Sequence, residues 1–194
     1  MKQIEVENIK KVTSALFVST TFDTFCVTEA SFSTLVNITI DGHINQEFLK
    51  PAGGTATTVA ETASGQNDRG QLTGSEQLEN ASGGFSHTAE PTAQQIVTWQ
   101  QIRPLCYEAI KGSRAPLKFK IVFMTPPEKV AGFLAKQNLN INASEVAGLF
   151  MNIRFEGGKL SCTSGTSTRT FSLDKSLENA WDASVEAFIR KFSA

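Results

Sequence analysis

Apolar positions in the first fifty residues follow two different periods. Residues 7–18 carry apolar side chains at the spacing of one helix face, and residues 32–41 alternate between two sides. The first pattern predicts a helix, preceded by a short strand at residues 3–6. The second predicts a strand with one buried face and an antiparallel neighbour before it. Asp41-Gly42 is typical of a turn, after which a short third strand is expected over residues 44–48.

The C-terminal hundred residues show the same two periods. Strict alternation over residues 117–124 predicts a strand, and residues 149–155 predict another that turns back through a Gly-Gly pair into an antiparallel partner. The run from Thr125 to Glu128 combines a Thr at the N-cap, a Pro at the first position and a Glu at the third, which predicts a helix over residues 126–137. A long amphipathic helix is expected over residues 175–192.

Residues 51–91 follow neither period. They hold half of the chain's 14 glycines and few large apolar side chains, so they cannot bury enough surface to offset the entropy of ordering. We therefore expect a single domain over residues 1–194, in which blocks 1–50 and 92–194 share one core around a polar, flexible insertion. Directly after this insertion, Thr98 and Gln101 match a capping box that begins a further helix.

The order of these elements predicts the fold class. Two β-α-β-β units flank the insertion and its following helix, and the alternation in their strands favours antiparallel pairing with one open face. We expect an α+β fold: a mainly antiparallel sheet built from the two units, helices on one face and a long C-terminal helix.

Composition narrows the function classes. The 194 residues are 19% charged and 40% hydrophobic with a net charge of −1, which gives no general attraction for nucleic acid or anionic membrane. No apolar run is long enough to span a bilayer, and the first residues do not resemble a secretory signal. Three widely spaced cysteines favour a reducing, cytoplasmic setting. The sequence leaves the oligomeric state open.

Catalytic candidates are few. Asp41 and His43 lie at a predicted strand end, where the carboxylate could orient the imidazole, and Cys162 could supply a nucleophile from a hydroxyl-rich stretch. The simpler interpretation is a turn at Asp41-Gly42 and buried, inert cysteines. No Cys or His spacing fits a zinc site, and no motif indicates a cofactor. Whether the protein is an enzyme stays open at this point.

Candidate ligand-binding residues are basic or hydroxyl-bearing. Two lysines share the polar side of the strand at 117–124, an arginine of the next strand is expected on the same face, and two further arginines flank the middle helix. The stretch at 162–169 offers hydroxyls, a glycine and the Arg169 guanidinium, and its backbone N–H groups could cradle an anion, although a polar hairpin turn is the simpler interpretation. The full set is Arg103, Arg114, Lys118, Lys120, Arg154, Ser164 and Thr166. The alternative is an ordinary solvated sheet surface.

A series of short motifs lies outside residues 51–91. They are Glu29-Ala30-Ser31, residues 40–45, Trp99 with Ile102-Arg103-Pro104, Ile110-Lys111-Gly112, residues 149–155, 162–167 and 173–178, and Trp181-Asp182. The series resembles an uncharacterised domain family of unknown function from anaerobic Gram-positive bacteria. The resemblance implies a bacterial, cytoplasmic protein and brings no activity, cofactor or catalytic residue. The insertion is expected to be particular to this protein.

These observations lead to one functional hypothesis and two alternatives. We expect a non-catalytic binding or regulatory module that uses a polar, partly basic sheet face to bind a protein or a small anionic ligand. The first alternative is a small enzyme that depends on Cys162 and His43. The second rests on a weaker topological likeness, because paired β-α-β-β units also build the domains of DNA sliding clamps, which suggests a clamp-like accessory protein.

Overall fold

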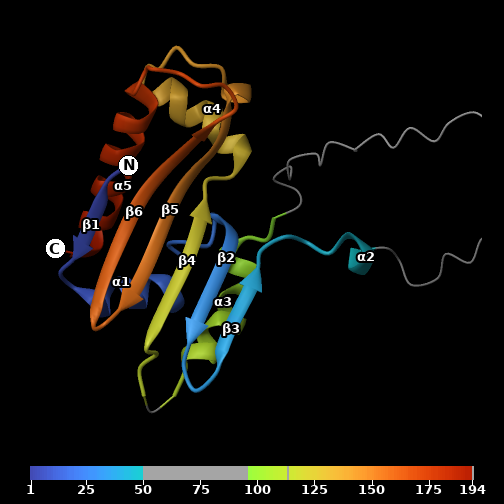
Figure 1. Cartoon of the computed structure of the whole chain (residues 1–194), viewed down its shortest axis with the longest axis vertical. Helices are drawn as coiled ribbons and strands as arrows, with labels where there is room; N and C mark the ends of the chain where they lie inside the picture. The colour runs from blue at the N-terminus through green and yellow to red at the C-terminus, as the bar shows by residue number, and fades with distance from the viewer. Residues whose placement is uncertain (50–95, 113, 194) are drawn as a thin grey trace, which may run out of the picture. The chain divides into compact units, whose positions relative to one another are not determined.

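The computed structural model describes residues 1–49, 96–112 and 114–193 (Figure 1). The predicted insertion at 51–91 lies outside the described residues. The chain divides into two units: residues Met1–Asn45 together with Pro91–Ala194 form the first, and Gln46–Glu90 form the second. Of the second unit, the structure describes the short helix α2 (Gln46–Leu49).

The first unit contains a six-stranded sheet in the order β1-β6-β5-β4-β2-β3, and every neighbouring pair is antiparallel (Figure 1). Its strands are β1 (Gln3–Val6), β2 (Cys26–Ser33), β3 (Asn37–Asp41), β4 (Lys118–Met124), β5 (Val146–Glu156) and β6 (Lys159–Thr168). The two sequence blocks interleave, because β1 pairs with β6 and β2 pairs with β4. The predicted α+β class with an antiparallel sheet is confirmed.

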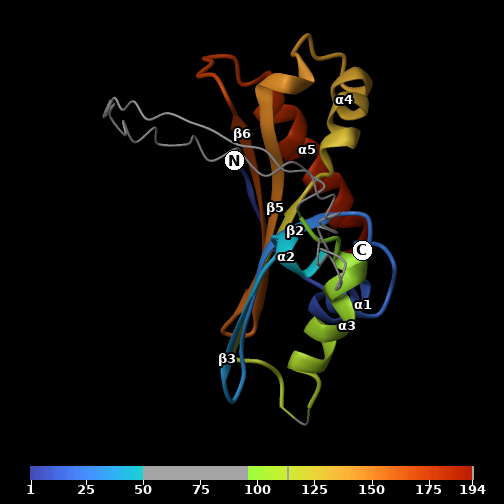
Figure 2. The same ribbon diagram turned by 90° about the vertical axis from the view of Figure 1, so that its right-hand side faces the viewer.

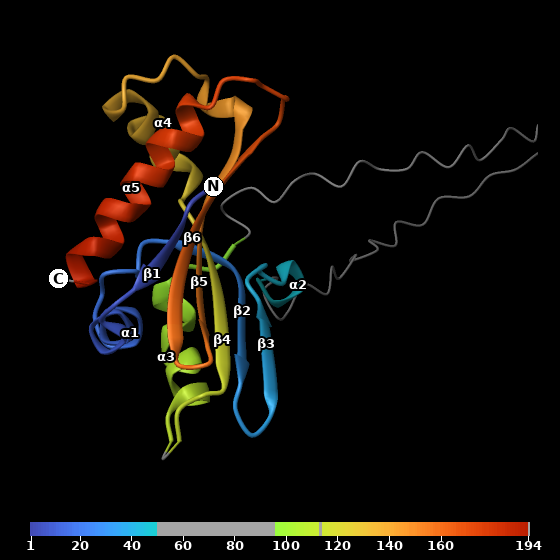
Figure 3. The same cartoon turned by 60° about the vertical axis from the view of Figure 1, so that its left-hand side comes forward.

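Four helices of this unit cover one face of the sheet, as the edge-on view shows (Figure 2). They are α1 (Ile9–Phe17), α3 (Trp99–Ile110), α4 (Pro127–Lys136) and the C-terminal α5 (Ser176–Ser193), and a 3₁₀ turn, η2 (Ala143–Glu145), precedes β5. Helices α1 and α3 lie behind one half of the sheet, and α4 and α5 lie toward the other (Figure 3). No described helix of this unit covers the opposite face.

The core lies between the sheet and these helices. Alternate residues of β4 point into it, and Phe119, Ile121 and Phe123 are at most 3% exposed. The indole of Trp99 packs against Phe123 and donates from Nε1 to the Leu16 carbonyl oxygen at 2.7 Å, which ties α3 to α1. The capping box predicted at Thr98 is confirmed and begins α3.

The predicted strand over 32–41 is wrong in its bounds. A reversal lies inside it: β2 ends at Ser33 and β3 begins at Asn37, which are paired with each other. Leu35, at the tip, is 100% exposed. The alternation continues through the turn because apolar residues occupy exposed turn positions, so periodicity alone could not show where the chain reverses.

The expected third strand over 44–48 is also wrong, since residues Gln46–Leu49 form α2. Gly42 does not turn a hairpin. Its N–H donates to the Thr28 carbonyl oxygen at 3.1 Å, its carbonyl accepts from Val97 N–H at 2.9 Å, and a Cβ atom there would lie 1.6 Å from the Val27 carbonyl oxygen. A glycine is required because two backbone segments meet there without room for a side chain.

The predicted N-cap of α4 is displaced by one residue. Pro126 occupies the cap position and Pro127 begins the helix, so Thr125 lies just outside it. The Thr125 hydroxyl is buried and has no hydrogen-bond partner among the described residues.

Candidate functional site

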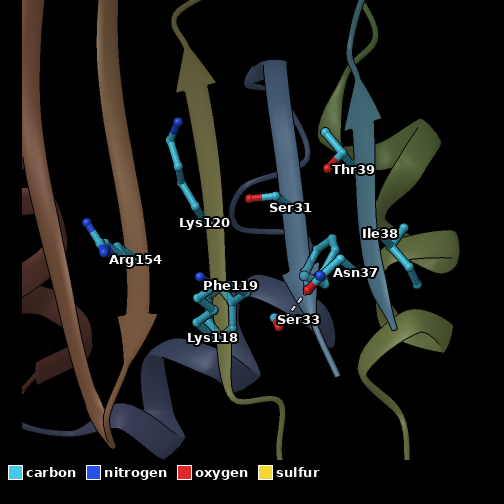
Figure 4. Close-up of a pocket in the computed structure, with 10 residues that line it drawn as sticks. Ser31, Ser33, Asn37, Ile38, Thr39, Lys118, Phe119, Lys120 and Arg154 are labelled. Carbon is cyan, nitrogen blue, oxygen red and sulfur yellow. Dashed lines mark hydrogen bonds between the residues drawn. The ribbon is translucent and has the colours of Figure 1, made fainter. Parts of the chain in front are cut away.

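The open face of the sheet brings three predicted cations together (Figure 4). Lys118 and Lys120 alternate with the buried residues of β4 and therefore project away from the helices. The register places Lys120 directly opposite Arg154 of β5 and Ser31 of β2. Lys118 pairs in register with Ser33 on the β2 side. These residues lie on one face because directly opposed residues of antiparallel strands share a side.

A hollow of about 380 Å³ lies over this part of β2, β3, β4 and β5. Its walls carry the three cations, four short polar side chains and three apolar residues. They are Ser31, Phe32, Ser33, Asn37, Ile38, Thr39, Lys118, Phe119, Lys120 and Arg154. The Ser33 hydroxyl hydrogen-bonds to Asn37 Oδ1 at 2.7 Å (Figure 4). Among the described residues, no carboxylate lines the hollow, and its own wall carries positive charge.

Two glutamates lie beside the hollow and pair with two of its cations. Lys120 Nζ lies 2.9 Å from Glu29 Oε2, and Arg154 pairs with Glu156. All four side chains are between 41% and 63% exposed, so each pair contributes at most about 1 kcal/mol. Within residues 1–49, 96–112 and 114–193, no carboxylate lies within ion-pair distance of Lys118.

Sequence reasoning missed the polar wall on β2 and β3. Ser31 and Thr39 are paired in register, and Ser31 also faces Lys120. A hairpin placed at residues 34–36 would have put these hydroxyls beside the lysines. Because one continuous strand was predicted over residues 32–41, this arrangement could not be foreseen.

The other predicted ligand residues lie elsewhere. Arg103, on α3 in the helix layer, lies 3.3 Å from Asp23 and also donates to the Ser19 carbonyl oxygen. Ser164 is fully buried: its hydroxyl accepts from Lys2 N–H at 2.9 Å and donates to Asp182.

Two predicted ligand residues remain. Thr166 pairs in register with the buried Leu149, away from the hollow. Arg114 is exposed between α3 and β4. Neither lines the hollow that Lys118, Lys120 and Arg154 share.

The Cys-His enzyme alternative requires residues that the fold separates. Cys162 is fully buried on β6, where it is paired with Ile4 of β1 on one side and Ile153 of β5 on the other. Burial raises the pKa of its thiol from 9.0 to about 12. His43 follows β3, and three strands separate β3 from β6, a distance of roughly 19 Å at the usual strand spacing. A joint site of Cys162 and His43 is therefore not formed, which corrects that hypothesis.

Asp41 and His43 do contact each other. The His43 backbone N–H donates to Asp41 Oδ1 at 3.1 Å, and His43 Nδ1 approaches the same oxygen. The hydrogen bond from the His43 side chain is the main reason that the pKa of Asp41 lies below its ordinary value. Both side chains are about half or more exposed, so this pair closes a solvent-exposed loop beside Gly42.

Neither a metal centre nor a membrane-spanning helix is found in the described part of the chain. No group of three or more His, Cys, Asp or Glu side chains there could hold a metal ion. None of its helices is both long enough and apolar enough to cross a bilayer.

A family model matches most of the sequence, over residues 15–66 and 75–193. The chain belongs to DUF5721, a family of unknown function. This confirms the predicted membership of an uncharacterised domain family. The DUF5721 match enters residues 51–91 from both ends, so the expectation that this segment is particular to the protein is wrong for 51–66 and 75–91. No curated protein and no solved structure matches the chain, and the likeness to sliding clamps stays a prediction.

Proposed function

We propose that this protein is a non-catalytic binding or regulatory module whose open sheet face binds a small anionic ligand. The observation that carries the proposal is that Lys118, Lys120 and Arg154 border one hollow whose described lining residues include no carboxylate. The Arg154 side chain extends away from the lysines in Figure 4, so binding requires that it turn toward them. Lys120 and Arg154 are directly opposed, and each is paired with a glutamate that reduces the repulsion between them. A bound anion takes the place of these glutamates as the partner of both cations.

The wall chemistry suits a phosphate or carboxylate group. The Arg154 guanidinium offers paired donors in a plane that matches two oxygens of one oxyanion, while the lysines act as point charges. Hydroxyls of Ser31 and Thr39 lie in the same wall and add neutral donors. Binding requires that Lys120 and Arg154 weaken their contacts with the glutamates, which is a small loss for exposed pairs. Because the site is exposed, its affinity should fall as salt concentration rises.

We also infer that the protein acts in the bacterial cytoplasm. Three free cysteines, all buried, support a reducing compartment. The resemblance described for the sequence supports the bacterial source.

A titration with pyrophosphate, followed by amide NMR shifts at low ionic strength, tests the proposed function. We expect shifts to concentrate on β2, β4 and β5 in the wild type. The variant Lys118→Ala/Lys120→Ala/Arg154→Ala should weaken binding at least about tenfold, since it removes three favourable charges. Its stability should change by less than about 1 kcal/mol because the side chains are exposed.

The matched control is Lys10→Ala/Lys136→Ala/Lys191→Ala, which removes the same net charge from exposed positions on the helices. It should bind pyrophosphate nearly as the wild type does. Equal weakening in both variants would mean general charge attraction and would refute the hollow as the site. If pyrophosphate fails to bind and an acidic peptide binds with dependence on Lys118 and Lys120, the occupant is a protein.

A further inference from the structure

A second cavity, of about 210 Å³, lies on the helix-covered side of the sheet. It is formed where α4 and α5 meet the segment leading into β2, and α4 and α5 lie side by side in Figures 2 and 3. Ring contact between Phe133 of α4 and Trp181 of α5, with centroids 5.4 Å apart, closes one side. Phe25, Met151, Val185 and Phe188 supply most of the remaining apolar wall.

One buried polar group in this wall lacks a partner. Thr125 is 8% exposed, and within the part of the chain that the structure describes its Oγ1 makes no hydrogen bond. Pro126 has taken over the N-cap position of α4, and no side chain caps the helix there. A buried hydroxyl without a partner is unfavourable, and a bound water, an ion or a ligand is one way in which a native protein satisfies such a group.

The charge of the wall is asymmetric. Of the described residues that line the cavity, Lys129 is the charged one and none is acidic. Lys129 is exposed, so it lies at the solvent side, whereas Thr125 is buried. The cavity therefore combines an apolar wall with one cation, Lys129, and one hydroxyl, Thr125. Such a wall favours a ligand with an apolar body and a negative group over one with a positive group.

We propose that this cavity binds a small carboxylic acid with an aromatic or short aliphatic body. The carboxylate pairs with Lys129, and the body packs among the rings of Phe133, Trp181 and Phe188. The Thr125 hydroxyl is buried, so it hydrogen-bonds to the carboxylate after its side chain rotates toward the cavity. The cavity is smaller than the roughly 300–1,000 Å³ of pockets for drug-sized molecules, so a ligand of about ten non-hydrogen atoms fits. This site lies on the opposite face from the basic hollow and does not depend on the proposed function.

Titration of phenylacetate into the full chain tests the proposal, with tryptophan fluorescence and amide NMR shifts as readouts. Trp181 is part of the wall, so its emission should change on binding. We expect binding in the millimolar range or tighter for so small a ligand, roughly tenfold tighter than for the cation phenethylamine. Neutral phenylacetamide should fall between the two.

Three variants separate the contributions. Lys129→Gln should weaken phenylacetate about fivefold and leave phenylacetamide unchanged, whereas Lys136→Gln, on the same helix outside the wall, should change neither. Thr125→Val should weaken both ligands about threefold to tenfold without lowering the melting temperature of the free protein, because the hydroxyl has no partner to lose. Ser184→Phe should fill the cavity and abolish binding.

Several results would overturn the proposal. They are no binding of phenylacetate to the wild type at roughly 10 mM, equal binding by wild type and Lys129→Gln, or amide shifts that avoid Thr125 and Ser184. The last criterion uses the wild-type protein, so it decides the matter even if the Ser184→Phe variant does not fold.

Discussion

On β4, Phe119, Ile121 and Phe123 lie beneath the helices with at most 3% exposure, while Lys118 and Lys120 project from the opposite side of the same strand. The same division continues on β5, where Met151 and Ile153 are buried and Arg154 is exposed. The covered face removes apolar surface from water and therefore stabilises the fold. The polar side chains of the open face remain in contact with water and contribute less to stability.

The two faces also differ in how firmly their polar and thiol groups are held. On the covered face, potentially reactive groups such as Cys162 and Ser164 are buried and held by packing or hydrogen bonds. On the open face, charged groups such as Lys120 are paired only at the surface and can exchange partners. Core packing and the proposed binding thus involve alternate residues of single strands, and substitutions at adjacent positions should separate their effects.

The largest difference is expected between Phe123→Ala and Val122→Ala. Phe123 is fully buried and contacts the rings of Phe22 and Trp99, with centroids 5.2 and 5.3 Å apart. Its truncation should lower the free energy of unfolding by about 3–5 kcal/mol, through lost burial and a cavity. Val122, on the other side of the strand, should lose less than about 1.5 kcal/mol. Urea denaturation measures both, and similar losses would contradict the division between faces.

A smaller difference is expected between Ser164→Ala and Thr163→Ala. Removal of the Ser164 hydroxyl leaves Lys2 N–H and the Asp182 carboxylate without this partner, which should lower the free energy of unfolding by about 1–3 kcal/mol. Thr163 lies on the open side of β6, so Thr163→Ala should change the free energy of unfolding by less than about 0.5 kcal/mol. If Ser164→Ala left the free energy of unfolding unchanged, these hydrogen bonds would not hold β1 and α5 to β6.

The smallest effect concerns pH. Burial raises the pKa of Cys162 from 9.0 to about 12, so the folded state keeps its proton where the unfolded state loses it. The contribution to stability is present below pH 9 and is lost as pH rises from 9 toward 12. Relative to Cys162→Ala, the wild type should lose about 1.4 kcal/mol between pH 8 and pH 10. Urea denaturation at several pH values measures this, and parallel profiles would mean that Cys162 is accessible to solvent.

Prediction from sequence succeeded where local periodicity was unambiguous. The alternation at 117–124 gave β4, and the capping box at Thr98 gave the start of α3. It failed where a local signal had another cause. The Asp41-Gly42 pair predicted a turn, but Gly42 is needed because its backbone closely approaches Val27 and Val97. These two residues are too far away in the sequence for a local pattern to reveal the contact.

For the candidate site, sequence reasoning identified the cations but not their surroundings. Lys118 and Lys120 share a face by parity within one strand, which requires no tertiary knowledge. The position of Ser31 and Thr39 beside the lysines depends on which strands pair. The burial of Ser164 depends on which side of β6 faces α5. Such contacts join residues far apart in the sequence, as between Lys2 and Ser164, which are 162 positions apart.

The sequence alone determined the kinds of most elements, though not at residues 34–36 and 46–49, together with the two-sided character of the strands and the residues able to carry positive charge. These follow from spacing and side-chain chemistry, which act over a few residues. The tertiary structure decided that β2 pairs with β4 and β1 with β6, that Cys162 faces inward, and that a hydroxyl beside α4 is left unused. Those outcomes depend on how the sheet closes against its helices, because long-range packing selects one register among many that local patterns permit.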